Sequence, residues 1–476
     1  MKDDKILLKS SFWYTVGNFL TRTIVFIATP IYIQFLTKSE YGIYSNFVSW
    51  MTIFSVLTGM NLQVSIMKSR YEFEDEIDGY LKTSYAVVFA FISVLLLVYF
   101  INPPYFKDFL KMDNIQIGLL FLYLYLYPAY NIYTAKYRAY FDIRSYMRAT
   151  FVYLTSTVVA SIALMLVMKE NRLTALIMGQ TIPVALLGFF FLLKIFITEG
   201  KIRKHLVQSA LQIGVPMIPH LLGVVILNKS DRIMLTNLVG SVDTAYYSVG
   251  GNVVAILAVI SNSLNNAFVP WLTGKLAEDN DRSEIKKNTN LQVLLYSIMV
   301  AGMLLIGPEI VFFFGGKSYA PARAALVPLL LGTVFQHVYI LYMNLEFYKK
   351  KTTGIAIGTT VAALLNIVLN YMFIPKYGFV AAAYTTFFSY LVLLMIHYFI
   401  CRKLDMTKVY DNKFIFASLT ILTVYGYFVE KIYDFILIRY IIVAIAGIIV
   451  LLIMYRKREL IRKLLQNRRK KKSEQK

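Results

Sequence analysis

Arg22 is the residue whose type and position carry the clearest chemistry in this sequence. It interrupts an apolar run from Phe12 to Leu36, which is long enough to cross a bilayer as a helix. An arginine in mid-membrane costs about 2.5–3.5 kcal/mol on insertion scales, so it must face a wet cavity or a polar partner. Thr15 and Asn18 share its helical face. The pattern favours an anion site in a central cavity, with a structural arginine bonded to carbonyls of a neighbouring helix as the alternative.

A second candidate is Glu309, because carboxylates are nearly absent from the apolar runs of this chain. A transporter that uses an ion gradient needs a titratable or coordinating group within the membrane. Glu309 follows Gly307 and Pro308 near the end of an apolar run and is the best candidate for ion coupling. The alternative is a surface ion pair with Lys317 or Arg323.

No residue pattern indicates a metal, a cofactor or covalent catalysis. The single cysteine, Cys401, excludes an intramolecular disulfide and a cysteine-based metal site, and the four histidines have no ligand-like spacing. Gly316-Lys317-Ser318 resembles the end of a phosphate-binding loop, but Val311 stands where that motif requires a glycine. We therefore predict a protein that is not an enzyme and that holds no metal and no cofactor.

The composition of the chain is that of a polytopic membrane protein. Of its 476 residues, 58% are hydrophobic and only 16% are charged. Runs of about 20 apolar residues predict an all-α fold with fourteen membrane-spanning helices. Their expected bounds are 12–36, 41–67, 81–102, 115–135, 149–168, 173–196, 206–228, 244–270, 290–314, 321–345, 352–374, 378–400, 413–430 and 436–455. For the seventh span, a continuation to about Leu238 is the alternative to an end at residue 228.

The spans are expected to form two pseudo-symmetric six-helix lobes followed by two extra helices. A weak repeat indicates this, because Glu40–Ser45 and Asp243–Ser248 are similar and each follows a long helix with a polar stripe. Internal repeats around a midplane site are the usual plan of secondary transporters. The expected divisions are 1–205 for the N-terminal lobe, 206–402 for the C-terminal lobe, and 403–476 for the last helices and a basic tail.

Spans 1 and 7 contain residues that interrupt a helix. Pro30 lies in the first, and Gly214, Pro216 and Pro219 lie in the seventh. A proline removes a backbone hydrogen bond and kinks the helix that contains it. Kinks at matching places in two halves predict hinges of moving helices, and static kinks that improve packing are the alternative.

The net charge of +22 is distributed according to the side of the membrane. Loops on the side of the termini hold most of the lysines and arginines, so both termini are expected in the cytoplasm. The tail contains the cluster Arg468–Lys472, which predicts binding to anionic lipid headgroups. We expect no nucleic-acid partner, because the preceding amphipathic turn delivers this cluster to the membrane.

Tyrosines gather near one face of the fourth span and its exit. Anchoring at the membrane surface is the ordinary role of such residues. The more specific alternative is a wall on which sugar rings stack. The tyrosines concerned are Tyr123, Tyr127, Tyr130, Tyr133, Tyr137 and Tyr140.

Several stretches resemble the polysaccharide-exporter branch of the multidrug/oligosaccharidyl-lipid/polysaccharide flippase superfamily. The most specific resembles the turn of that family between spans 11 and 12, and the resemblance covers nearly the whole chain. The stretches are Glu40–Ser45, Gly214–His220, Ser230–Leu235, Ala245–Val249, Gly315–Gly332 and Leu365–Thr385.

The resemblance implies a flippase that moves undecaprenyl-diphosphate-linked oligosaccharide repeat units across the bacterial plasma membrane by alternating access. It implies a role in O-antigen, capsule or exopolysaccharide synthesis, with a polysaccharide polymerase as an expected partner. Arg22 occupies the place of a cavity residue that meets the pyrophosphate. Asp231, Arg232 and His220 match family positions around span 7 and are expected to line the cavity. Asp231 and Arg232 can instead pair with each other as a structural ion pair.

Two other classes of function compete with a flippase. A drug or metabolite antiporter of the same superfamily usually has a carboxylate in the first span, where this chain has only Arg22. A membrane polymerase or glycosyltransferase requires a large outer loop with catalytic groups, and the sequence has none. The alternative that stays open is therefore the antiporter.

Overall fold

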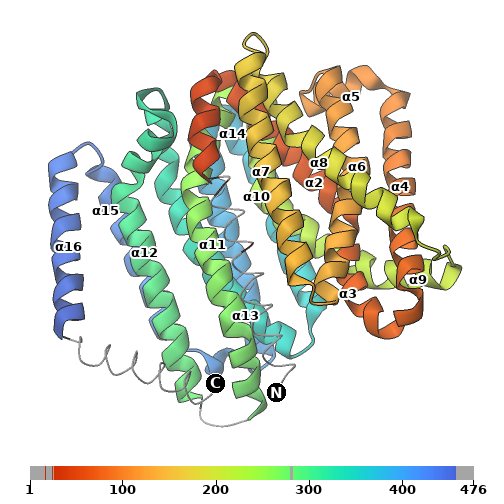
Figure 1. Ribbon diagram of the computed structural model, residues 1–476. Helices are drawn as coiled ribbons and strands as arrows, with labels where there is room; N and C mark the ends of the chain where they lie inside the picture. Colours follow the sequence, from red (N-terminus) through yellow and green to blue (C-terminus); the bar gives the residue numbers. More distant parts are fainter. Residues whose placement is uncertain (1–16, 18–23, 25, 279–281, 457–476) are drawn as a thin grey trace.

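The computed structural model describes residues 17, 24, 26–278 and 282–456, and the regular elements of these residues are helices (Figure 1). Apolar runs fold this way in a membrane because a helix satisfies its own backbone hydrogen bonds. The helices are α2 (Lys38–Gly59), α3 (Leu62–Glu72), α4 (Ile77–Ile101), α5 (Pro103–Leu110), α6 (Asn114–Ala139), α7 (Ile143–Val167), α8 (Arg172–Ile197), α9 (Lys204–Gly214), α10 (Ile218–Leu238), α11 (Ser241–Ala277), α12 (Ser283–Gly315), α13 (Leu326–Tyr348), α14 (Thr352–Lys403), α15 (Asn412–Lys431) and α16 (Ile436–Arg456). Four short 3-10 segments join them: η1 (Glu74–Glu76), η2 (Val215–Met217), η3 (Lys317–Ala325) and η4 (Thr407–Val409).

The described residues contain 10 helices long and apolar enough to cross a membrane, or up to 11 if the bent pair α9–α10 is one span. The expected spans 352–374 and 378–400 form the single element α14, which turns at Gly378 with φ 60 and ψ −145. Asn366 and Thr386 are hydrogen-bonded across this turn at 3.3 Å, so the two parts of α14 lie side by side. The all-α fold is confirmed, and the count of fourteen stays a prediction.

The seventh expected span is broken where the sequence places its glycine and prolines. The helices α9 and α10 meet at η2 with a bend of 48°. A side chain at Gly214 would meet the Met60 carbonyl oxygen at 2.2 Å, so this break packs directly on the end of α2. For the seventh span, the alternative end at Leu238 is confirmed, because α10 continues to that residue. The other expected hinge residue, Pro30, lies inside a continuous helix, Phe26–Phe35.

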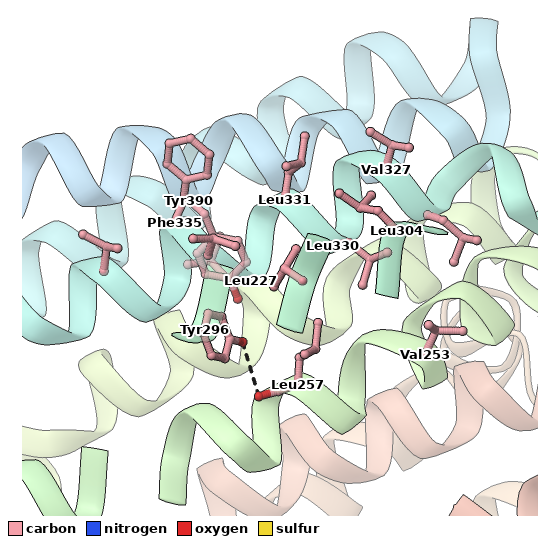
Figure 2. Close-up of a cluster of buried hydrophobic side chains, with 14 of the residues drawn as sticks. Leu227, Val253, Leu257, Tyr296, Leu304, Val327, Leu330, Leu331, Phe335 and Tyr390 are labelled. Carbon is pink, nitrogen blue, oxygen red and sulfur yellow. Dashed lines mark hydrogen bonds between the residues drawn. The ribbon is translucent and has the colours of Figure 1, made fainter. Parts of the chain in front are cut away.

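Two large clusters of buried apolar side chains form the interior. One uses residues between Phe47 and Ala210, and it includes Leu206 and Ala210 of α9. The other is built mainly from α11 to α15, and Figure 2 shows its centre, where the Tyr296 hydroxyl donates to the Leu257 carbonyl at 3.3 Å. The break in the seventh span thus lets α9 join the N-terminal cluster. The expected division of the lobes at residue 206 stays a prediction.

Candidate functional site

A cavity of about 210 Å³ with a mixed apolar and polar lining, which we call the polar cavity after its hydroxyl and amide groups, lies where α2, α3 and α6 face α10. Its polar lining consists of hydroxyl and amide groups, with no charged side chain among the lining residues, which include Leu221 of α10. Such groups hydrogen-bond neutral hydroxylated molecules without imposing a charge on them. The polar lining residues are Thr52, Ser55, Thr58, Asn61, Gln63, Tyr127 and Asn131.

One edge of the polar cavity continues into a stack of tyrosines from α6 and α7. The rings of Tyr123 and Tyr127 stack with centroids 4.6 Å apart, and those of Tyr130 and Tyr153 with centroids 5.3 Å apart. Tyr123 is 5% exposed and Tyr130 is 7% exposed, so anchoring at the membrane surface is the wrong interpretation for these two. Tyr127 is the member of the stack that lines the cavity. A wall for sugar rings stays a prediction that rests on Tyr127.

Two cations lie near the middle of α10, on the helix that closes the polar cavity. Lys229 is partly exposed, and its ammonium group has no hydrogen bond or ion pair within the described part of the chain. Arg232 donates from Nε to the Ser248 hydroxyl at 3.1 Å and from Nη1 to the Asn228 carbonyl at 3.0 Å. No carboxylate among the described residues forms an ion pair with either cation. Both charges are therefore available to an anionic ligand.

Arg232 is held in place by α11. Its guanidinium lies over the ring of Tyr247, 5.4 Å from the centroid. A side chain at Gly251 would approach Nη2 of Arg232 to 2.5 Å, so glycine provides the room that the guanidinium occupies. The position of this cation therefore depends on two residues one turn apart on α11.

Asp231 is fully buried and forms no ion pair with either of the two cations. Its carboxylate accepts hydrogen bonds from the Tyr247 hydroxyl, from Asn370 Nδ2 at 2.6 Å and from Thr386 Oγ1 at 2.7 Å. These donors come from α11 and from both parts of α14. Such a network satisfies a buried carboxylate with neutral donors and joins three helix segments at one point.

The expected ion pair between Asp231 and Arg232 is wrong. Neighbouring positions on a helix point about 100° apart, and here the carboxylate turns to α14 while the guanidinium turns to Ser248. Asp231 has no exposed surface in this conformation, which also separates it from the cavity that it was expected to line.

The structure describes only one of the remaining expected cavity residues. His220 is partly exposed at the start of α10, where its Nδ1 lies 3.2 Å from the Thr359 hydroxyl of α14. Arg22, Asn18 and Thr15 lie outside the described residues, so their part in a cavity stays a prediction.

Glu309 has a partner that the sequence did not indicate. Arg439 of α16 binds its carboxylate through two nitrogens, at 2.8 and 2.7 Å. The expected alternative partners were wrong, because Arg323 pairs with Asp434 at 2.7 Å and Lys317 lines the same pocket without an ion pair to Glu309. Its role in ion coupling stays a prediction, and its observed contact fastens α16 to α12.

The starts of α2 and α11 touch each other, at and just before the two copies of the sequence repeat. There Ser39 Oγ and Ser241 Oγ are 2.7 Å apart, and Lys38 Nζ donates to the Tyr246 hydroxyl at 3.1 Å. Gly42 allows this approach, because a side chain there would lie 1.8 Å from the Ser241 carbonyl oxygen. We call these residues the α2–α11 contact. The two helices that carry the copies of the repeat therefore touch at their starts.

Sequence reasoning missed Lys229 and the tie between Glu309 and Arg439. Lys229 lies just past the expected end of span 7 at residue 228 and inside the alternative end at Leu238. A helical projection continued to Leu238 would have placed it on a face with Arg232. The position of Arg439 near the start of an apolar run indicated a polar partner, because an arginine within the membrane requires one.

The sequence of this chain is similar to those of membrane proteins related to polysaccharide synthesis. Residues 7–275, more than half of the chain, match the model of the family described as polysaccharide biosynthesis protein. An uncharacterized membrane protein of Haemophilus influenzae is 21% identical over 76% of this chain and 89% of its own length. The capsular polysaccharide biosynthesis protein CapF of Staphylococcus aureus is 27% identical over 36% of this chain and 44% of its own. A protein of Shigella flexneri named as an O-antigen transporter is 25% identical over 32% of this chain and 37% of its own.

Solved structures share the fold over most of the chain. The lipid II flippase MurJ in an inward closed conformation has a TM-score of 0.65 at 15% identity, covering 90% of this chain and 99% of its own. An inward-facing multidrug resistance MATE transporter has a TM-score of 0.61 at 12% identity, covering 82% and 95%. The chain therefore shares the fold of these two transporters.

Proposed function

Because the chain belongs to the polysaccharide biosynthesis protein family, we propose that it flips undecaprenyl-diphosphate-linked oligosaccharide repeat units across the bacterial plasma membrane. Such a cargo has three chemically different parts: a lipid tail, a diphosphate and a neutral or weakly charged glycan. The proposal requires a protein surface suited to each part within one cleft.

The observation that carries the proposal is the free ammonium group of Lys229 beside Arg232, on the helix that borders an uncharged polar cavity. An unpaired cation in a membrane-spanning segment is costly, which favours a ligand that supplies the opposite charge. Phosphate oxygens accept charge-assisted hydrogen bonds from both side chains. Leu221, which lines the polar cavity, precedes Lys229 by eight positions, or about 12 Å along a helix, so diphosphate and sugar can bind together.

The cycle that fits this arrangement is alternating access. The α2–α11 contact closes one end of the cleft, and its separation would open that end. The break between α9 and α10, at Gly214 and Pro216, would let α10 move relative to the N-terminal cluster. Gly214, Pro216 and Pro219 are then hinge residues, and Pro30 lies within the continuous helix Phe26–Phe35.

The orientation in the membrane follows from the charge distribution. We place both termini in the cytoplasm, which puts the α2–α11 contact on the outer side and leaves the polar cavity toward the cytoplasm. The basic tail would then bind anionic lipids of the inner leaflet. A polysaccharide polymerase on the outer side is the partner that would consume the flipped units.

Neither the proposed cargo nor its movement requires an enzymatic step, a cofactor or a metal. The His, Cys, Asp and Glu residues of the described chain form no group of three that could hold a metal ion. Arg22 belongs to the proposed diphosphate site together with Thr15 and Asn18, on the reasoning given for the first span.

The decisive experiment is a depletion strain from which undecaprenyl-linked oligosaccharides are extracted and analysed by mass spectrometry. A finished repeat unit should accumulate, protected in intact cells from an added glycosidase. That result would also identify the cargo. If no such lipid accumulates and the strain becomes sensitive to cationic compounds, the drug or metabolite antiporter replaces the flippase.

A further inference from the structure

The C-terminal half contains a buried pair of titratable side chains that the proposed cargo site does not use. Glu346 lies in the last turn of α13 and His397 lies in the second part of α14. Both side chains are fully buried, and Glu346 Oε1 is 2.6 Å from His397 Nδ1. Neither residue lies within a stretch that carried the family resemblance.

Each member of the pair has one polar atom without a partner. Glu346 Oε2 and His397 Nε2 are both buried and form no hydrogen bond. An unsatisfied buried polar group costs about 1–3 kcal/mol, so a pair that served only packing would be expected to satisfy both atoms. The two atoms face Gly354 and Gly358 of α14, where added side chains would lie 3.2 and 3.4 Å from them.

The surroundings of the pair supply no other full charge. Tyr339 of α13 stacks on the His397 ring with centroids 5.4 Å apart, and Cys401 of α14 donates to a carbonyl of α13. His220 of α10 lies close enough to His397 for their charges to interact. Among the described residues, no lysine, no arginine and no further carboxylate forms an ion pair with either member.

These surroundings decide how many protons the pair holds. With one proton, on Nδ1, the pair is a neutral imidazole beside a carboxylate and carries a net negative charge in an apolar interior. Burying such a charge without a counterion is strongly unfavourable. With a second proton on Nε2, the pair is an imidazolium carboxylate with no net charge. Burial therefore favours the doubly protonated pair.

We propose that Glu346 and His397 form a proton-binding site that couples the conformational change to one proton. When the helices separate and water reaches the pair, the proton on Nε2 passes to water. The neutral imidazole retains its Nδ1 proton, which stays hydrogen-bonded to the carboxylate. When the helices close again, the proton is taken back. The role of this exchange in transport rests on the proposed function, but the exchange itself does not.

The pair is placed so that movement of the cargo site would open it. The first part of α14, which covers both unpartnered atoms, is joined to α10 by His220 with Thr359 and by Ser230 with Asn366. The helix α10 carries Lys229, the free cation of the cargo site. His397 is six residues before the end of α14, about 9 Å along the helix, so a proton has a short path to the surface.

The test measures conformation against pH without any cargo. Asp108→Cys on α5 and Ser318→Cys on η3 are exposed positions in the two halves, and the native Cys401 is buried and leaves the labels specific. The distance between the two spin labels is measured by pulsed electron paramagnetic resonance, on the protein in lipid nanodiscs at a series of pH values. Raising pH should shift the distance distribution away from the conformation that buries the pair, by up to about tenfold in population ratio per pH unit, the limit for one linked proton.

Two variants decide whether the pair is responsible. Glu346→Gln retains the size of the side chain and removes its charge, so it should hold the distribution in its low-pH form. Glu309→Gln removes the rival carboxylate and should titrate like the parent. A parent without pH response, or a Glu346→Gln variant that is folded by size-exclusion chromatography and titrates like the parent, would overturn the proposal. Either result leaves the cargo experiment on the depletion strain unaffected.

Discussion

At the scale of single residues, function depends on which charges are free and which are neutralised by neighbours. Asp231 and Glu309 are carboxylates with several hydrogen bonds, and Lys229 is a cation with none within the described chain. A charge that has protein partners stabilises a conformation. A charge without them is free to bind a ligand, which is why Lys229 carries the proposal.

Replacing Lys229 should reduce export of the polysaccharide without affecting insertion. A hydrogen bond to a charged group contributes about 1.5–3 kcal/mol, so Lys229→Ala should lower export roughly tenfold or more. Lys229→Arg retains the charge and should keep part of the activity. Export is measured as polymer at the cell surface, normalised to protein in the membrane. Lys431→Ala, at an exposed site on α15, is the matched control, and unchanged export by Lys229→Ala would remove this cation from the site.

Replacing Asp231 should destabilise the protein and not merely weaken cargo binding. In Asp231→Ala the three donors on Tyr247, Asn370 and Thr386 lose their acceptor while staying buried. At about 1–3 kcal/mol for each unsatisfied group, the midpoint of thermal unfolding in detergent should fall clearly. Asp434→Asn, which breaks an exposed pair, should leave the midpoint almost unchanged. Equal midpoints for both variants would contradict the network described here.

At the scale of helices, the two halves meet through the α2–α11 contact, and a close approach there depends on Gly42. The capping box of Thr37 and Glu40 begins α2 at this point, since each residue accepts a hydrogen bond from the backbone of the other. The start of α2 is thereby held rigidly against Ser241. Alternating access requires that this contact separates in every cycle.

A disulfide across the α2–α11 contact should stop transport. Ser39 and Ser241 bring their hydroxyls to 2.7 Å, so the double variant Ser39→Cys with Ser241→Cys should form a disulfide on oxidation. Export should be lost when the bond forms and should return on reduction. Ser39→Cys alone is the control and should be insensitive to oxidant. A cross-linked protein that exports at the normal rate would exclude opening at this end.

The approach of α11 to α10 sets the position of Arg232. Gly251→Ala should displace the guanidinium, because the added methyl group would lie 2.5 Å from Nη2. Export should fall while the protein stays folded, as judged by its elution from a size-exclusion column. Gly302→Ala, where no atom lies within 4 Å, is the matched control. Wild-type export by Gly251→Ala would show that the arginine tolerates displacement.

At the scale of the whole molecule, the bundle has central and peripheral helices. Figure 1 shows α16 at one edge of the bundle and α4 and α5 at the other, with α10, α11 and α14 between them. The helices that carry the cations and the Asp231 network are therefore central. The peripheral α16 is fastened through Arg439 and Glu309.

The proposed direction can be checked by labelling. Ser318→Cys lies in η3 on the side assigned to the exterior and should react with a membrane-impermeant maleimide in intact spheroplasts. Lys350→Cys, in the turn between α13 and α14, should react only after permeabilisation. The buried Cys401 should not react in either case. The reverse pattern would invert the orientation and place the polar cavity toward the exterior.

Much of the fold can be predicted from short stretches of the sequence. An apolar run in a membrane has to satisfy its backbone hydrogen bonds within itself, so length and composition alone predict a helix and its approximate bounds. The same reasoning located the break at Gly214 and Pro216, because proline and glycine act on their own turn of helix. The repeat around Glu40 and Asp243 likewise predicted that two similar elements exist, but not that they touch.

The tertiary structure alone decided which polar groups meet. Asp231 and Arg232 are neighbours in the chain and both reach α11, yet only Asp231 also hydrogen-bonds to α14. Glu346 and His397 are far apart in the chain and share a hydrogen bond. Helical periodicity relates positions within one segment, but the helix that covers a given face is chosen by the packing of the whole bundle. The approximate bounds of the helices, the fold class and the family could therefore be predicted from the sequence. The pairing of the buried charges could not.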